Sequence, residues 1–183
     1  AIKRTNGALR IWMSVQSMDK DVLKNIRRDN ISVDQMLDLS PTIKEANLPT
    51  TSELILALPG ETYETHVNSI RDMVRAKMDD IQVYTCMMLH GAELNTVKQR
   101  EKWGLKTKFR LLPRDFAKLS NNKNVVEIEE VIISTNTLTF EEYVELRVLA
   151  LVLWTTSVSI AFEPILKLLR EKNMDVFELF YRS

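Results

Sequence analysis

The stretch SELILALPGET, residues 52–62, indicates a buried strand that ends in a turn and continues into a helix. Its apolar run stops at Pro59 and Gly60, two residue types that interrupt regular structure. From Thr62 onward, apolar side chains recur at the three- and four-residue spacing of one helix face. We therefore expect a strand over 53–58, a turn, and a helix that begins near Thr62. The apolar face of that helix would comprise Val67, Ile70, Met73, Val74 and Met78.

Two neighbouring stretches have the same organisation. The first is SVQSMDKDVLKNIRR, residues 14–28, which overlaps the end of a strand predicted over 9–15. The second is IQVYTCMMLHGAEL, residues 81–94, which contains a strand predicted over 81–88. A helical segment separates each strand from the next, which is the arrangement of parallel βαβ units and not of hairpins. The sequence therefore predicts an α/β fold with three parallel strands. In such sheets the functional side chains gather at the carboxyl ends of the strands.

Capping signals predict where several helices begin. Asp19 is expected to cap a short helix after the first strand. Ser32 and Gln35 have capping-box spacing, so the next helix should begin directly after Ser32, and Pro41 should break or offset it. Thr139 and Glu142 have the same spacing ahead of a long helix.

The second half of the chain has a different pattern. KTKFR at 106–110 is expected to form a solvated basic surface, and VVEIEEVIIST at 125–135 indicates a strand whose pairing partner the sequence leaves open. We predict a boundary near 92–95, which divides the chain into a first domain over 1–94 and a mainly helical α+β C-terminal extension over 95–183.

Composition narrows the classes of partner. The 25 Lys and Arg residues balance the 25 Asp and Glu residues, so no net charge favours nucleic acid or an anionic membrane surface. Thr and Ser interrupt the apolar run at 148–162, which predicts a buried helix and turn instead of a membrane span. Alone, the single cysteine, Cys86, can hold neither an iron-sulfur cluster nor zinc. We expect its side chain to pack in the third strand. This cysteine usage favours a reducing, cytoplasmic location.

The three strand endings resemble the second half of a radical S-adenosylmethionine (radical SAM) barrel, closest to the members that carry a separate cobalamin-binding domain. The matching motifs extend over 10–94, roughly half of the chain. The resemblance implies three βα units of a partial, half TIM-type barrel. It also implies S-adenosylmethionine and an iron-sulfur cluster as cofactors of the parent enzyme and, as in those closest members, cobalamin.

The resemblance also assigns S-adenosylmethionine contacts to residues of this chain. In the family, a Gln and an acidic residue bond the ribose, and they match Gln16 and Glu53. An Arg of the family binds the methionine carboxylate, and it matches Arg28. Taken singly, Gln16 could end a strand, Arg28 could interact with a helix dipole, and Glu53 could be a solvated side chain. The residues that would line the adenine are Val83, Tyr84 and Thr85.

The turn after the second strand matches the family pattern Gly-Leu-Pro-Gly-Glu-Thr with one change. Pro59 and Gly60 are kept and would shape the turn beside the cofactor, but Ala57 replaces the first Gly. A strand conformation would accept Ala there, whereas a positive φ favours Gly. A second departure is His90, which replaces Pro in the Leu-Pro-Gly ending of the third strand.

The cluster-binding CxxxCxxC motif of the family precedes the first barrel strand, and this chain has no such motif. We therefore expect a fragment of a radical SAM enzyme that is inert alone and whose partner is the missing N-terminal half of the barrel. Its substrate stays unknown.

Two alternatives are open. One is a non-catalytic half-barrel that serves as a binding or scaffold module, which Ala57 and His90 favour. The other is an unrelated βα enzyme in which Glu53 and Arg28 bind a phosphorylated metabolite, although its strand ends have few glycines for a phosphate cradle.

Overall fold

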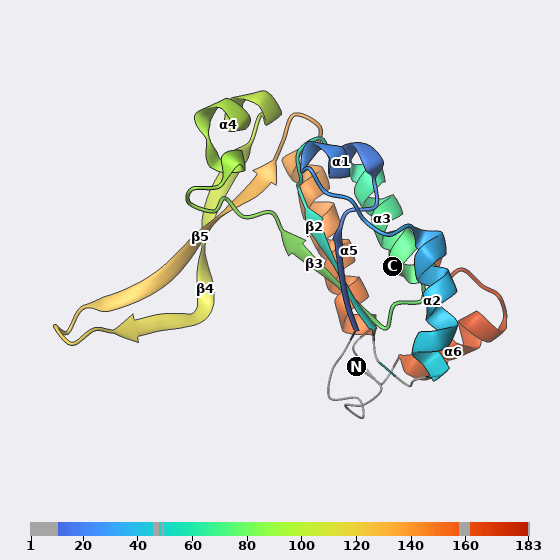
Figure 1. Cartoon of the computed structure of the whole chain (residues 1–183). Coiled ribbons are helices and arrows are strands. Elements are labelled where there is room, and N and C mark those ends of the chain that lie inside the picture. The colour runs from blue at the N-terminus through green and yellow to red at the C-terminus, as the bar shows by residue number, and fades with distance from the viewer. Residues whose placement is uncertain (1–10, 46–47, 49, 158–161, 183) are drawn as a thin grey trace.

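A computed structural model of the chain describes residues 11–45, 48, 50–157 and 162–182. Its central sheet has three parallel strands in the order β1-β2-β3 (Figure 1). These strands are β1 (Ile11–Gln16), β2 (Thr50–Leu56) and β3 (Asp80–Thr85). The predicted parallel α/β sheet is confirmed, whereas residues 9 and 10 of the first predicted strand lie outside the described part of the chain.

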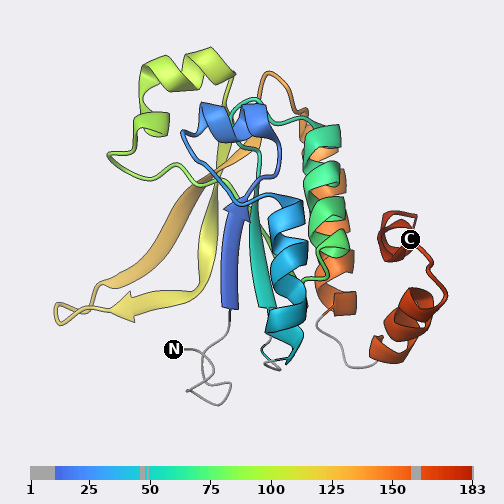
Figure 2. The same cartoon turned by 45° about the vertical axis from the view of Figure 1, so that its right-hand side comes forward.

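Helices cover one face of this sheet. Figure 2 shows α2 (Val33–Glu45), α3 (Tyr63–Arg75) and α5 (Phe140–Ser157) standing together beside the strands. Leu54 and Leu56 of β2 are fully buried on that side. The core between the layers also contains Val15, Val67, Ile70, Met73, Ile81, Leu146 and Leu153.

The helix starts follow the predicted caps. Asp19 Oδ1 accepts hydrogen bonds from the backbone N–H groups of Asp21 and Val22, at 3.0 and 2.9 Å, and α1 (Lys20–Asn25) begins there. The backbone N–H of Ser32 donates to Gln35 Oε1 at 2.8 Å, which closes the capping box of α2. The helix then runs through Pro41 to Glu45, so it is not broken at Pro41. A proline removes one backbone donor, and α2 continues across that gap.

The second half of the chain contributes an antiparallel hairpin. It consists of β4 (Lys106–Lys118) and β5 (Asn124–Ser134), and it extends away from the body of the molecule (Figure 1). The strand predicted over 125–135 is confirmed, but its partner β4 was not predicted. The basic residues at 106–110 are exposed as expected, yet they alternate with Thr107 and Phe109, which is a strand period.

The hairpin is preceded by a short helical segment and followed by helices that return to the body. The preceding elements are η2 (Glu93–Asn95) and α4 (Val97–Trp103). After the hairpin, α5 packs against β3 and α3, and the chain ends with α6 (Glu163–Glu171) and α7 (Val176–Tyr181). The run at 148–162 was predicted to be a buried helix, but the α5 side chains of Val148, Leu151 and Trp154 are exposed. None of the helices in the described ranges is long and apolar enough to cross a membrane.

Candidate functional site

The three strands bring a row of polar side chains together on one face of the sheet. The register aligns Ser14 of β1 with Glu53 of β2, and Glu53 with Gln82 of β3. Side chains at aligned positions of neighbouring strands point to the same face. Leu54, the next residue of β2, is buried toward the helices, so this row lies on the opposite face, which we call the open face.

Glu53 occupies the centre of the open face. Its Oε2 accepts a hydrogen bond from the Ser14 hydroxyl, and its side chain is half-buried. Its Oε1 makes no hydrogen bond with any residue in the described part of the chain. A carboxylate with one oxygen available can accept hydrogen bonds from the hydroxyls of a ligand.

Polar side chains of β3 continue this row along the strand. Gln82 Nε2 donates to Asp80 Oδ2 at 2.8 Å, and the Tyr84 hydroxyl donates to Gln82 Oε1. Burial, with the nearby carboxylates of Glu53 and Asp80, raises the pKa of Tyr84, so its phenol is protonated at neutral pH. Asp80 Oδ1 is buried and has no hydrogen-bond partner among the described residues. The open face therefore presents the carboxylate of Glu53 next to the phenol of Tyr84.

The residues predicted to line the adenine divide between the two faces. Tyr84 shares the open face with Glu53. Thr85 is buried toward the helices, where its hydroxyl lies 3.3 Å from the Tyr143 hydroxyl of α5. The carbonyl oxygen of Val83 accepts a hydrogen bond from Arg147 Nη1 at 3.2 Å. The adenine role of these residues stays a prediction, and only Tyr84 presents its side chain on the open face.

Gln16 and Arg28 both lie near the carboxyl end of β1. Gln16 has a φ of 63° after a shift in the strand register. The guanidinium of Arg28 donates through Nη2 to the carbonyl oxygen of Ser14 and through Nε to Asn30 Oδ1 at 3.0 Å. Asn30 in turn donates to the carbonyl oxygen of Val15 at 2.5 Å. Arg28 forms no ion pair with a described residue, so its charge is available to an anionic ligand near Ser14 and Glu53.

Comparison with known proteins places this chain among radical SAM enzymes. It is 38% identical over 96 residues to the cobalamin-dependent radical SAM methyltransferase TokK of Streptomyces tokunonensis, covering 52% of this chain and 14% of that protein. It is 30% identical over 134 residues to the 2-(S-pantetheinyl)-carbapenam-3-carboxylate methyltransferase of Streptantibioticus cattleyicolor, covering 73% of this chain and 19% of that protein. This chain belongs to the radical SAM superfamily. The predicted resemblance is confirmed, and the chain spans less than a fifth of the length of these relatives.

The structure resembles an N-terminally deleted Elp3 from the archaeon Methanocaldococcus infernus with a TM-score of 0.44 and 24% identity, covering 55% of this chain and 24% of that chain. No protein-family profile matches the sequence.

The turn after β2 adopts the conformation that a glycine would favour. Ala57, which replaces the first Gly of the radical SAM pattern, has a φ of 69°, so the strand conformation considered for it is wrong. Gly60 also has a positive φ, of 81°, and Pro59 is buried between the two. The backbone N–H of Ala57 donates to Glu61 Oε2 at 2.7 Å. That hydrogen bond holds the backbone in the left-handed region although the residue carries a Cβ.

Glu61 forms a buried pair that sequence reasoning missed. Its Oε1 lies 2.8 Å from Nδ1 of His66, and both side chains are fully buried. The hydroxyl of Thr137 donates to the carbonyl oxygen of Glu61 at 2.7 Å, which ties the turn to the second half of the chain. The five-residue spacing of an acid and a His across a helix start was the only sequence signal for this pair.

No iron-sulfur site exists in the described part of this radical SAM chain. Its residues include no group of three or more His, Cys, Asp or Glu side chains that could hold a metal ion. Cys86 is buried as predicted, and burial, with the charge of Glu61, raises the pKa of its thiol to about 12. A protonated, enclosed thiol does not fit a cluster ligand, because the thiolate is the form that binds metal.

Proposed function

We propose that this chain is the S-adenosylmethionine-binding part of a cobalamin-dependent radical SAM methyltransferase. The observation that carries the proposal is the open face, where the half-buried carboxylate of Glu53 stands between Ser14 and Gln82 on three parallel strands. The similarity of this chain to a cobalamin-dependent radical SAM methyltransferase and to a second methyltransferase supports the same conclusion. The three βα units would form the second half of a partial TIM-type barrel.

Individual residues of this half suit separate parts of S-adenosylmethionine. Glu53 would accept hydrogen bonds from the ribose hydroxyls, with Gln16 at the carboxyl end of the adjacent strand as a second ribose contact. Arg28 would meet the methionine carboxylate, because a guanidinium forms paired hydrogen bonds to a carboxylate. Adenine would lie along β3 beside Tyr84. When bound to a reduced cluster, the cofactor supplies the radical chemistry, and these residues hold and orient it.

The iron-sulfur ligands must come from another segment, since the chain contains a single cysteine. The described part of the chain pairs β1 with a strand on one side only, which leaves its outer edge open to another strand. We propose that an N-terminal half of the barrel adds to this edge and carries the cluster, with a cobalamin domain elsewhere in the longer protein. The substrate would be a small molecule that accepts a methyl group, as the name of one relative states for that protein.

The scaffold-module alternative is less well supported. Its main sequence argument was Ala57 in place of Gly, yet Ala57 adopts the positive φ that the turn requires. Ala57 is therefore compatible with a positive φ at this position, and the alternative rests on His90 alone.

The test uses the complete reading frame that contains these residues, with Glu53→Gln compared with Glu127→Gln. Glu127 is an exposed carboxylate of β5, so the control removes the same charge far from the open face. We expect Glu53→Gln to lower 5′-deoxyadenosine formation about tenfold or more and to raise the KM for S-adenosylmethionine, because a hydrogen bond to a charged group contributes about 1.5–3 kcal/mol. Equal rates in both variants would contradict the proposal. Residues 1–183 alone, reconstituted with iron and sulfide, are expected to produce no 5′-deoxyadenosine.

A further inference from the structure

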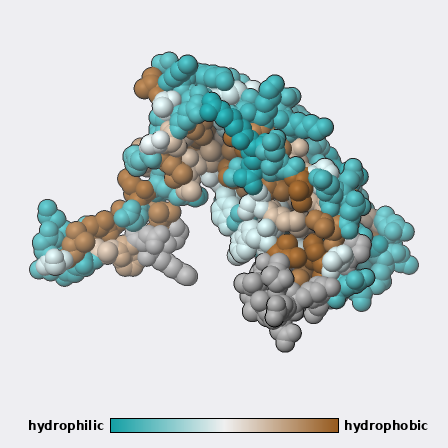
Figure 3. Space-filling view, viewed as in Figure 1, coloured by the Kyte–Doolittle hydropathy of each residue, from teal (hydrophilic) through white to brown (hydrophobic). Residues whose placement is uncertain are grey.

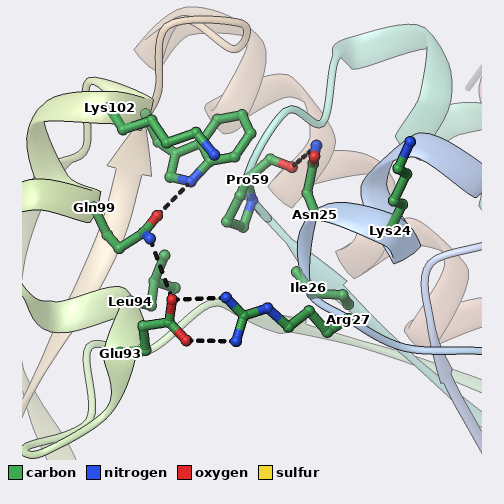
Figure 4. A pocket seen from close by; sticks show the side chains of 10 residues that line it. Lys24, Asn25, Ile26, Arg27, Pro59, Glu93, Leu94, Gln99 and Lys102 are labelled. Carbon is green, nitrogen blue, oxygen red and sulfur yellow. Dashed lines mark hydrogen bonds and ion pairs between the residues drawn. The ribbon is translucent and has the colours of Figure 1, made fainter.

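A cavity lies at the same edge of the sheet as the carboxyl ends of the strands. It has a volume of about 400 Å³, and three segments form its walls: the end of α1, the turn after β2, and the stretch from η2 to α4. Each segment follows a different strand, so the cavity spans the edge of the sheet where parallel α/β folds bind ligands. Its size is within the range of small-molecule sites. We call this cavity the edge pocket (Figure 4).

Hydrogen bonds between the segments define the shape of the edge pocket. Asn25 Nδ2 donates to the carbonyl oxygen of Pro59 at 3.0 Å, which joins α1 to the turn. The Arg27 guanidinium bonds both carboxylate oxygens of Glu93, at 3.0 and 3.1 Å, which joins α1 to η2 (Figure 4). A Cβ on Gly60 would lie 2.5 Å from Asn25 Nδ2, so only glycine permits this close approach without displacing a neighbour.

One wall of the edge pocket is apolar and flat. The indole of Trp103 lines this wall and is fixed by a hydrogen bond from Nε1 to Gln99 Oε1 at 3.0 Å. Pro59 and Leu94 add apolar surface beside it. A ring or short apolar chain of a ligand can pack against such a wall.

The charges around the edge pocket do not cancel. Three cationic side chains line it, and the only acidic one, Glu93, is already bonded to Arg27. Lys24 and Lys102 form no ion pair with a residue in the described ranges, and the ammonium of Lys102 lies 4.3 Å from the centre of the Trp103 ring. The lining therefore has two uncompensated positive charges next to an apolar wall.

From this arrangement we infer that the edge pocket binds a small molecule in which a phosphate or carboxylate is attached to an apolar or planar group. The apolar group packs on Trp103 and Pro59, and the anion lies between Lys24 and Lys102. Calling this molecule the substrate rests on the proposed function, whereas the binding itself does not. The ligand would enter from the edge at which Gln16 and Arg28 also stand.

The test is a titration of the 183-residue chain followed by the indole N–H signal of Trp103, assigned with Trp12→Phe and Trp154→Phe variants. The probes are phenyl phosphate, benzoate and benzyl alcohol, which share a ring and differ in charge. We expect saturable shifts of the Trp103 signal with the two anions and none with benzyl alcohol. A response to phenyl phosphate alone would restrict the ligand to phosphates, and a response to benzoate alone would restrict it to carboxylates.

Charge variants then locate the anion. Lys24→Gln and Lys102→Gln are each expected to raise the Kd about threefold to fivefold, the effect of one partly exposed charge. Lys98→Gln removes a lysine of the same helix α4 that does not line the pocket, so it should leave the Kd unchanged. The inference is overturned if the Trp103 signal does not respond, if benzyl alcohol binds equally, or if Lys98→Gln weakens binding as much as Lys24→Gln. Because the titration needs neither S-adenosylmethionine nor turnover, such a failure leaves the proposed function standing.

Discussion

Ala57 and Glu61 show how single residues fix the turn that carries the radical SAM pattern. Ala57 is fully buried with a φ of 69°, and its backbone N–H and that of Leu58 both donate to Glu61 Oε2, at 2.7 and 3.3 Å. Glu61 is also fixed by His66, at 2.8 Å. A left-handed backbone costs an L-residue about 1–2 kcal/mol, and these hydrogen bonds offset it.

Substitution of Ala57 tests this balance. Ala57→Gly relieves the backbone but loses a buried methyl group and increases the entropy of the unfolded chain, so we expect a change within about 1 kcal/mol. Ala57→Val places a branched side chain at a positive φ in a closed site, and we expect a loss of about 2 kcal/mol or more in the free energy of unfolding. Urea unfolding measures both changes.

The matched control for Ala57→Val is Ala92→Val. Ala92 has a φ of −72° and a ψ of 144°, an extended conformation that valine accepts. We expect little change at that position. Equal destabilisation by the two valines would show that the left-handed backbone of Ala57 is not the cause.

Among the elements, α5 shows how one helix joins the two halves of the sequence. It begins at a capping box, in which the backbone N–H of Glu142 donates to Thr139 Oγ1 at 3.2 Å and the backbone N–H of Thr139 donates to Glu142 Oε2 at 2.7 Å. Leu146 and Leu153 of α5 are buried in the same core as β2 and α3. The boundary near 92–95 stays a prediction, and this helix contributes to the core on its other side.

Loss of this cap should destabilise the shared core. We expect Thr139→Ala to lower the free energy of unfolding by about 1 kcal/mol, because it leaves backbone donors of the first turn unpaired. Thr139→Ser keeps the hydroxyl and should restore most of that loss. Thermal and urea unfolding of the three proteins provide the measurement, and a serine variant as unstable as the alanine variant would rule out the cap as the cause.

Local signals explain which elements could be predicted from the sequence. The parallel strands, the buried face of α3 and the caps at Asp19, Ser32 and Thr139 depend on residues a few positions apart, and they are found in the structure. Which strands and side chains would pair with one another could not be predicted in the same way. The pairing of β4 with β5 depends on how the chain returns on itself. The Glu61–His66 pair is local in sequence, but it forms only because the turn after β2 buries both side chains. Alternation along β3 places the side chain of Thr85 toward α5, on the face opposite Tyr84, and its adenine role stays a prediction.

For the whole molecule, the open edges and exposed apolar side chains bear on its association. The outer edge of β1 has no paired strand in the described part of the chain, and the side chain of Trp12 on that strand is 53% exposed. Figure 3 shows apolar surface along the β4–β5 hairpin, where the exposed side chains include Phe109, Leu111, Phe116, Val126 and Ile128. Unpaired edges and exposed apolar side chains both favour association with another chain or segment.

We expect the isolated chain to self-associate, and two lysine substitutions separate the edge from the hairpin as its cause. A lysine on an edge strand opposes strand pairing, so Trp12→Lys should increase the monomer fraction in sedimentation velocity, and Phe109→Lys on the hairpin should increase it less. Co-expression with the N-terminal half of the reading frame should suppress self-association in the same way, because the proposed partner would occupy the β1 edge. A wild-type chain that stays monomeric at high concentration would contradict the prediction that the open β1 edge causes self-association. A stronger effect of Phe109→Lys than of Trp12→Lys would assign the association to the hairpin instead.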